Sequence, residues 1–202
     1  MSQLSQSLET FLSELSSRAA TPGGGSAAAL VGATAAALCA MVGRLNDKKD
    51  GTPGALHEII EPADELRARL CALVDEDIAA FNELAASWKL SEEDADQRER
   101  KQAAVLRATQ SPLTIMEKAV EVMELSLQGL ERSKKNCLSD AGCAALCAHA
   151  ALDAARLNVL INLPGLHDPE LRAGLRRKVD TLVTDARRIR AAVDAALDAN
   201  YG

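Results

Sequence analysis

The chain has 202 residues, of which 48% are hydrophobic but only 2% aromatic, and its formal net charge is −6. The negative charge, together with the lack of a basic stretch interleaved with aromatics, argues against a dedicated nucleic-acid-binding protein. A chain with this apolar content is not disordered, and its length suits one domain with a sizeable core. Small and aliphatic side chains must fill that core, which favours closely packed helices over a β-sandwich.

The N-terminal residues and the cysteines indicate a cytoplasmic protein. The first ten residues lack the positive region and the apolar region of a signal peptide. The five cysteines are an odd number, and Cys143 and Cys147 stand at helical spacing rather than in a disulfide or zinc pattern. We therefore expect reduced, mostly buried thiols.

Apolar residues from Leu4 to Leu15 recur every three or four positions, which predicts a first amphipathic helix of about fifteen residues. The motif TPGGGS at 21–26 then interrupts the chain, and Ser26 is expected to cap the next helix. That helix, built of small residues, carries no charge over 26–43, a length that suits a membrane span. Its low hydrophobicity and the absence of an aromatic belt instead favour a helix buried in protein on all sides, with no membrane partner.

The rest of the chain also shows helical periodicity, and no strand pattern is evident. Ser91, Ser111 and the pair Ser139-Asp140 are expected to cap helices, with Pro112 at a first helical position. The expected helices cover about residues 55–88, 91–109, 111–129, 139–163 and 168 onward. We predict an all-α, single-domain bundle of six to seven helices over 1–202. Two helices of small residues are more easily surrounded with the help of a second subunit, so a symmetric dimer is expected.

The first candidate site is the run of three glycines, Gly23, Gly24 and Gly25, followed by Ser26. Glycines before a helix N-terminus leave backbone N–H groups unobstructed, which suits an anion or another polar ligand. The alternative is a turn that lets the helix tuck under its neighbour.

Asp77 is the second candidate, because it interrupts an apolar face. It stands four residues before Phe81 and three after Val74, so the three share one side of a helix. A carboxylate on such a face needs a partner, and its environment often shifts its pKa and suits it to proton transfer. An ion pair with an arginine across the bundle is an equally good interpretation.

A third set of polar residues stands in the later part of the chain: Asn136, Ser139, Asp140, Asn158 and Asn162. Helix capping is the simpler interpretation of Ser139 and Asp140, whereas Asn158 and Asn162 stand among apolar residues and need partners in the packing or in a ligand. Asp140 and Asn158 are five helical turns apart, about 27 Å, so they cannot share a site within one subunit. An antiparallel dimer would bring such ends together.

Other candidates are weaker. Lys48 and Lys49 would attract an anionic ligand, although a solvated pair is the simpler interpretation. His149 and Cys147 lie on opposite sides of a helix, which leaves a metal site unsupported. His57 and His167 are interpreted as surface residues, and no nucleophile–base pair can be identified.

Taken together, five segments resemble one family: FLSEL at 11–15, TPGGGS at 21–26, DIAAF at 77–81, NCLSDAG at 136–142 and LNVLIN at 157–162. In this order they are similar to the cyclodeaminase/cyclohydrolase family of tetrahydrofolate enzymes, and the resemblance extends from about Leu8 to Asp168. The loop at 46–51 has the family's lysines but lacks a neighbouring aromatic residue.

The resemblance implies an all-helical homodimer that acts on the one-carbon unit between N5 and N10 of tetrahydrofolate. Members hydrolyse 5,10-methenyltetrahydrofolate to 10-formyltetrahydrofolate, or cyclise 5-formiminotetrahydrofolate with release of ammonia. A chain of 202 residues leaves no room for the formiminotransferase domain often fused to the deaminase, which favours the cyclohydrolase. The rival hypothesis is a non-catalytic folate-binding or helical interaction protein.

The resemblance also implies roles for the candidate residues. Asp77 or Asp140 would stabilise the methenyl cation and accept a proton from water. Asn136, Asn158 and Asn162 would bind the edge of the pterin, and no metal or redox cofactor is expected. The remaining residues expected to bind substrate are Gly23, Gly24, Gly25 and Ser26 for carbonyl or carboxylate groups, Lys48 and Lys49 for the glutamate tail, and Phe81 and Ser139 within the same motifs.

Overall fold

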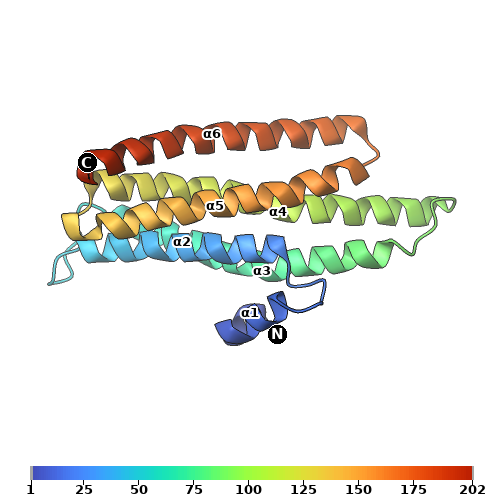
Figure 1. The fold of residues 1–202 in the computed structure, drawn as a ribbon, viewed down its shortest axis with the longest axis horizontal. Helices are drawn as coiled ribbons and strands as arrows, with labels where there is room; N and C mark the ends of the chain where they lie inside the picture. Colours follow the sequence, from blue (N-terminus) through green and yellow to red (C-terminus); the bar gives the residue numbers. More distant parts are fainter. Residues whose placement is uncertain (1, 202) are drawn as a thin grey trace.

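The computed structural model describes residues 2–201, and its elements are long antiparallel helices (Figure 1). The six α-helices of the described chain are α1 (Leu8–Leu15), α2 (Gly24–Asn46), α3 (Ile60–Ser87), α4 (Ala95–Arg132), α5 (Leu138–Asn162) and α6 (Pro169–Tyr201). Short 3-10 turns precede α1, α3 and α5 and follow α5. The prediction of an all-α bundle of six to seven helices is confirmed.

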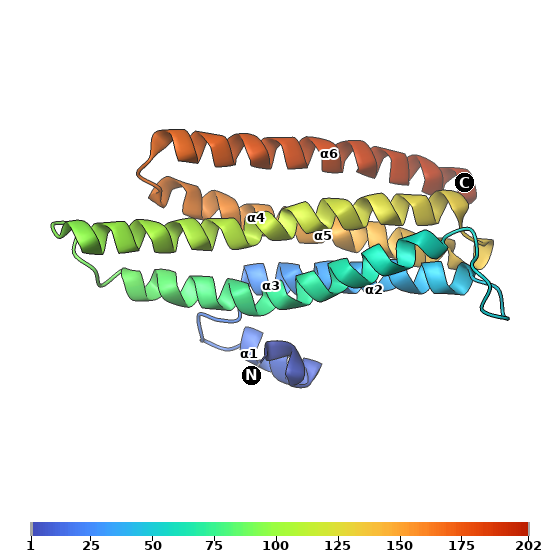
Figure 2. The same ribbon diagram turned by 180° about the vertical axis from the view of Figure 1, so that it is seen from behind.

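The bundle has two layers, with α2 and α5 in front of α3 and α4 in Figure 1, and the reverse in Figure 2. Helix α2 packs against α3 and α5, while α4 packs against α3 and α5. Helix α6 lies along α4 and α5, and α1 lies at the opposite edge of the bundle. Because α2 and α5 are antiparallel, the start of α2 lies beside the end of α5.

Small residues let α2 approach its neighbours closely. Ala29, Ala35 and Ala36 are fully buried, and a methyl group added at Gly32 would lie 3.1 Å from Leu70 on α3. Within one chain, however, one face of this helix stays uncovered, so its burial on all sides stays a prediction. Val31, Met41 and Leu45 are 37%, 38% and 51% exposed, because no other part of the described chain covers the outer face of α2.

A similar exposed apolar face lies on α5. Leu146, Leu157 and Ile161 are 40%, 67% and 78% exposed. By length and composition alone, Gly24–Asn46 and Lys135–Gly165 would suit a membrane span, and their most apolar windows are 61% and 39% buried within the bundle. Since the core helices of soluble proteins pass the same test, this is weak support for a membrane. The uncovered faces of α2 and α5 are the notable feature.

Helix α4 corrects two predictions. It begins after Asp94, whose side chain accepts a hydrogen bond from the Gln97 N–H at 2.9 Å, so Ser91 is not its cap. It also continues without interruption through Pro112, where the sequence predicted a new helix. A proline inside a helix removes one hydrogen bond to the carbonyl four residues earlier. A side chain from α5 satisfies that carbonyl, as described below.

The starts of three other helices also differ from expectation. Helix α1 is shorter than predicted, because a separate 3-10 turn forms at Gln3–Ser5 and Ser7 then caps the helix. Helix α2 begins two residues before Ser26, with Gly23 at the N-cap. In α5, Ser139 and Asp140 occupy the first turn rather than the cap, because a 3-10 turn at Lys135–Cys137 leads directly into the helix.

The cysteines are free, as expected, but fewer of them are buried than predicted. Cys39 and Cys137 are buried, Cys71 and Cys147 are partly buried, and Cys143 is exposed. The two buried thiols lie in the interior of the bundle, where Cys39 contacts Ser126 at 3.1 Å between Sγ and Oγ.

Candidate active site

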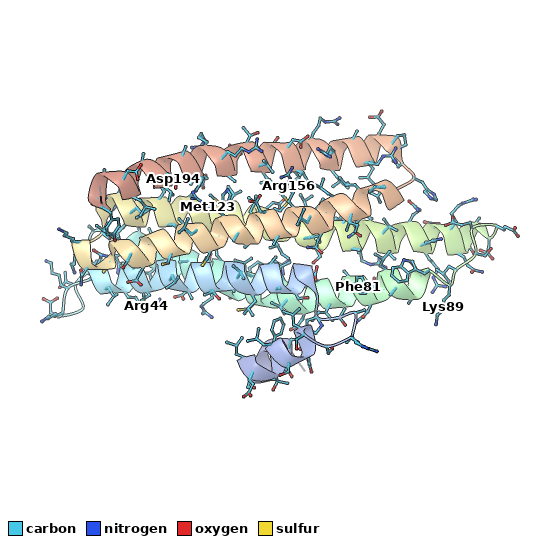
Figure 3. The ribbon with its side chains drawn as sticks, in the orientation of Figure 1. Arg44, Phe81, Lys89, Met123, Arg156 and Asp194 are labelled. Carbon is cyan, nitrogen blue, oxygen red and sulfur yellow. The ribbon has the colours of Figure 1, made fainter. Side chains whose placement is uncertain are left out.

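A cavity of about 240 Å³ lies where α2 begins, α5 ends and the middle of α3 passes. Figure 3 shows Phe81, one of its lining residues, on α3 near the start of α2, and Arg44 at the opposite end of α2. The lining residues are Ala20, Thr21, Gly23, Gly24, Gly25, Asp77, Phe81, Ala108, Asn158, Ile161 and Asn162. The fold therefore brings the glycine run, Asp77, Phe81 and the two asparagines of α5 to one place.

The first turn of α2 connects directly to the Asp77 carboxylate. The Ser26 hydroxyl is fully buried, accepts a hydrogen bond from the Gly23 N–H at 3.4 Å and donates to Asp77 Oδ2 at 3.0 Å. The first N–H groups of a helix have no partner within the helix, and they carry the positive end of its dipole. The start of α2 thus favours a negative charge at Asp77 or on a bound ligand.

Gly25 is required by the close approach of Asp77. A Cβ atom added at Gly25 would lie 2.6 Å from both Cγ and Oδ2 of Asp77, and closer still to Oδ1. Real Cβ atoms essentially never lie within 3.0 Å of another atom, so any larger residue would displace the carboxylate. Gly25 therefore has a more specific role than that of a flexible turn: it makes room for Asp77.

Burial raises the pKa of the Asp77 carboxyl, and hydrogen bonds from the hydroxyl and backbone N–H of Ser26 partly oppose that rise. No arginine pairs with Asp77 among the described residues, so the alternative of an ion pair across the bundle is not what the structure shows. Its acidic neighbours are engaged elsewhere: Asp75 accepts from the Gln3 N–H at 2.8 Å, and Glu76 pairs with Arg69. Asp77 is the carboxylate suited to proton transfer in this cavity.

The two asparagines of α5 are held by backbone carbonyls. Asn158 Nδ2 donates to Ala154 O at 2.9 Å, and Asn162 Nδ2 donates to Ala108 O on α4 at 2.8 Å. These two hydrogen bonds fix the positions of Nδ2 and Oδ1 in each amide, because a flipped amide would place its oxygen against the carbonyl oxygen. Both side chains are left with an Oδ1 acceptor for a ligand in the cavity.

Pro112 explains why Ala108 O is available to Asn162. In a regular helix the N–H four residues later would bond to this carbonyl, but residue 112 is proline and has no N–H. Asn162 supplies the missing donor from another helix. The break in the hydrogen bonding of α4 is therefore also an anchor for one side of the cavity.

The remaining predicted residues gather at the other end of the bundle. Lys48 and Lys49 lie in the loop after α2, while Asn136, Ser139 and Asp140 lie at the start of α5. Lys134 joins these two segments, because its N–H donates to Asn46 Oδ1 at 2.9 Å and its Nζ to Leu45 O at 3.0 Å. Within one chain this end does not contribute to the cavity around Asp77. The proposed roles of these five residues stay predictions.

Sequence reasoning missed several lining residues. Ala108 contributes a backbone carbonyl, which side-chain chemistry does not reveal, and Ile161 is an apolar residue with no chemical signature of a site. A useful signal was present at Pro112, since a proline within a long periodic segment frees a carbonyl one turn earlier. Among the residues that the structure describes, no group of three or more His, Cys, Asp or Glu could hold a metal ion.

Comparison with known proteins identifies the family. The family model described as formiminotransferase-cyclodeaminase matches residues 7–181, which include every segment of the cavity. The chain belongs to the formiminotransferase-cyclodeaminase family. It is 35% identical to a methenyltetrahydrofolate cyclohydrolase from Methylorubrum extorquens, over 90% of each chain. It is also 31% identical to the formimidoyltransferase-cyclodeaminase of Rattus norvegicus, over 98% of this chain and 38% of that protein.

The fold of this family member also matches a solved structure. The crystal structure of formiminotetrahydrofolate cyclodeaminase from Thermotoga maritima superposes with a TM-score of 0.88, covers 96% of both chains and is 28% identical in sequence. The match agrees with the family assignment and extends over the helices that form the cavity.

Proposed function

We propose that this protein is a methenyltetrahydrofolate cyclohydrolase, which hydrolyses 5,10-methenyltetrahydrofolate to 10-formyltetrahydrofolate. The relative of that name is similar over nearly its whole length. The observation that carries the proposal is the Asp77 carboxylate, which is partly buried in a cavity, bonded to Ser26 and free of any cationic partner among the described residues. A cationic substrate would supply the missing positive charge.

The charge of the substrate fits this environment. The methenyl bridge is a cation delocalised over N5, the bridging carbon and N10, and a carboxylate in a partly desolvated cavity attracts it more strongly than water does. The same carboxylate, with its raised pKa, is a better proton acceptor than an ordinary aspartate. Asp77 would therefore hold the cation and position the water that attacks its carbon.

The proposed steps conserve atoms and charge. Water adds to the bridging carbon as Asp77 takes one of its protons, which gives a neutral tetrahedral adduct. The bond between N5 and the bridging carbon then breaks, and Asp77 returns its proton to N5. The second proton of the water passes from the hydroxyl to the solvent as the formyl C=O forms on N10, so the reaction releases one proton. Water is the only other reactant.

The asparagine side chains suit the pterin ring. The ring presents N–H donors on its pyrimidine edge, and Asn158 and Asn162 present fixed Oδ1 acceptors to the cavity. Phe81 adds an aromatic surface on the same face of α3 as Asp77. Recognition of the ring and chemistry at the bridge thus involve different side chains of one cavity.

The alternative is a formiminotetrahydrofolate cyclodeaminase. The rat relative and the solved Thermotoga structure favour it. In that reaction N10 attacks the formimino carbon, and a proton donor assists the departure of ammonia. A carboxyl group with a raised pKa, such as Asp77, serves as that donor equally well.

We also propose that two copies pair through the exposed apolar faces of α2 and α5. A twofold axis near the middle of α5 would lay the two α5 helices antiparallel, which covers Leu146, Leu157 and Ile161 of each. The start of one α5, with Asn136, Ser139 and Asp140, would then approach the cavity of the other copy. Sedimentation analysis tests this pairing: Leu157→Glu should give monomers, and a monomeric wild type would contradict it.

The function is tested by two assays on one preparation. The absorbance of 5,10-methenyltetrahydrofolate is followed in a buffer where spontaneous hydrolysis is slow, and ammonia is measured with 5-formiminotetrahydrofolate. Faster loss of methenyl absorbance that disappears in Asp77→Asn supports the cyclohydrolase. Ammonia release alone indicates the deaminase, and activity with neither substrate contradicts both assignments.

A further inference from the structure

A second, larger hollow adjoins the cavity around Asp77. It has a volume of about 600 Å³ and shares Phe81, Ile161 and Asn162 with that cavity. Helices α3 and α4 and the turn after α5 form its walls, and the remaining lining residues are Leu84, Trp88, Glu92, Lys101, Gln102, Val105, Gly165 and His167. The shared residues place the two hollows side by side.

The first cavity is too small for a whole folate. Sites that bury a drug-sized ligand measure about 300–1,000 Å³, and the cavity around Asp77 has about 240 Å³. A reduced folate has three parts in a row: the pterin, a benzoyl ring and a glutamate with two carboxylates. With the pterin beside Asp77, the other two parts must leave the cavity, and the second hollow lies beside it.

The near end of this hollow suits an aromatic ring. Trp88 is 62% exposed, although it is the single tryptophan of the chain, and its ring meets Phe81 edge-on with centroids 6.2 Å apart. Leu84 and Val105 add buried apolar surface. A benzoyl ring placed here would cover the exposed indole and gain an aromatic contact.

The far end carries the positive groups. Lys101 forms an ion pair with Glu92 and is only 25% exposed, and Arg98 lies nearby, where its NH1 donates to Glu92 O at 3.4 Å. His167 faces the same hollow. Among the charged or titratable groups that line this hollow, Lys101 and His167 stand beside one carboxylate, that of Glu92, so an anion that displaces Glu92 would gain Lys101 as its partner.

The wall at this end is tied in place. Gln102 accepts from the His167 N–H at 2.8 Å and donates to Gly165 O at 3.1 Å, which fixes the turn after α5 against α4. The cationic end is therefore part of a formed groove rather than a set of free surface side chains.

We infer that this groove binds the aminobenzoyl-glutamate tail of the folate, with the benzoyl ring against Trp88 and a glutamate carboxylate at Lys101. The inference rests on the proposed function and adds a subsite to it. In this assignment Lys101 takes the place of Lys48 and Lys49 of the same chain as the binding site for the glutamate tail. Those two lysines lie beyond the far end of α2, about 34 Å away by helix length. Lysines of a second copy would be the competing site for the tail.

Trp88 offers a direct test, because no other tryptophan contributes to the fluorescence. Titration with p-aminobenzoylglutamate, the tail without the pterin, should change Trp88 emission and saturate. Lys101→Gln should raise the Kd by about two- to fivefold, the upper part of the range for a partly exposed charge pair. Glu92→Gln removes the competing carboxylate and should lower the Kd.

Lys118→Gln is the matched control, since Lys118 pairs with Glu121 and is 28% exposed but lies outside the groove. It should leave the Kd unchanged. An emission that does not respond, or a Kd that responds to Lys48→Gln and Lys49→Gln but not to Lys101→Gln, overturns the inference. This binding assay needs no turnover, so its failure is distinguishable from failure of the proposed reaction.

Discussion

The contact between Gly25 and Asp77 predicts a large loss of activity from a single methyl group. In Gly25→Ala the new Cβ would lie 2.6 Å from Cγ and Oδ2 of Asp77, and closer to Oδ1. The carboxylate must then shift by at least 0.4 Å, the difference between 2.6 Å and the 3.0 Å that Cβ contacts respect. The shift required at Oδ1 is larger.

That displacement acts on the atoms that hold the water. Misplacing a reacting group by about 1 Å costs about a hundredfold in rate, so we expect kcat to fall by about ten- to a hundredfold. Such a loss corresponds to about 1.4–2.7 kcal/mol in the activation free energy. Overpacking also lowers the free energy of unfolding by about 1–3 kcal/mol, which a thermal melt measures separately.

Methenyl hydrolysis is measured for Gly25→Ala, with folding checked by circular dichroism. Gly174→Ala is the control, because a Cβ on this α6 glycine would meet only the tip of Arg177, at 3.8 Å. A wild-type rate in Gly25→Ala would refute the reasoning.

Two further predictions separate stability from function. Because burial raises the pKa of native Asp77 above its unfolded value, the native state binds more protons in the interval between them, and the free energy of unfolding falls as pH rises. Asp77→Asn should therefore raise the Tm at pH 7 while abolishing turnover. The difference in Tm between the variant and the wild type should shrink as pH falls through that interval. A Tm of the variant at pH 7 that is unchanged or lower would contradict the burial argument. Asn162→Ala should lower the free energy of unfolding by about 1–3 kcal/mol, because it leaves Ala108 O without a hydrogen-bond donor. Asn158→Ala should lower it less, because Ala154 O keeps its backbone partner within the helix. Thermal melts of Asn162→Ala in a Pro112→Ala background test this explanation. Alanine at 112 restores an N–H that can bond to Ala108 O, so the loss of stability from Asn162→Ala should be smaller there. An equal loss in both backgrounds would contradict the explanation.

Much of the site was predictable from the sequence, because polar residues on apolar helical faces are conspicuous. Asp77 shares a face with Phe81, and Asn158 and Asn162 stand one turn apart near the end of a helix. Helical spacing also predicted that Asp140 and Asn158 lie far apart, and the fold places them near opposite ends of α5. These inferences depend only on local geometry, which the sequence determines well.

The errors have a common physical origin in contacts between distant residues. The Ser-Pro pair at 111–112 is typical of a helix start, yet α4 continues, because Asn162 binds the carbonyl that Pro112 leaves free. Similarly, Gly25 is a glycine because of Asp77, which lies 52 positions later in the chain. No local pattern reveals either contact.

The environment of Asp77 leads to one more prediction, about the pH dependence of the rate. Burial raises the pKa of this carboxyl in the free enzyme, but a bound methenyl cation would favour the ionised form and lower that pKa again. The acid limb of kcat/KM reports the free enzyme, and the acid limb of kcat reports the complex. The limb of kcat should therefore lie at lower pH than the limb of kcat/KM, once spontaneous hydrolysis is subtracted. If the acid limbs of kcat and kcat/KM coincide, the titrating group does not face the cation. Another carboxylate would then be the base, and Asp140 of a second copy would be the first to test.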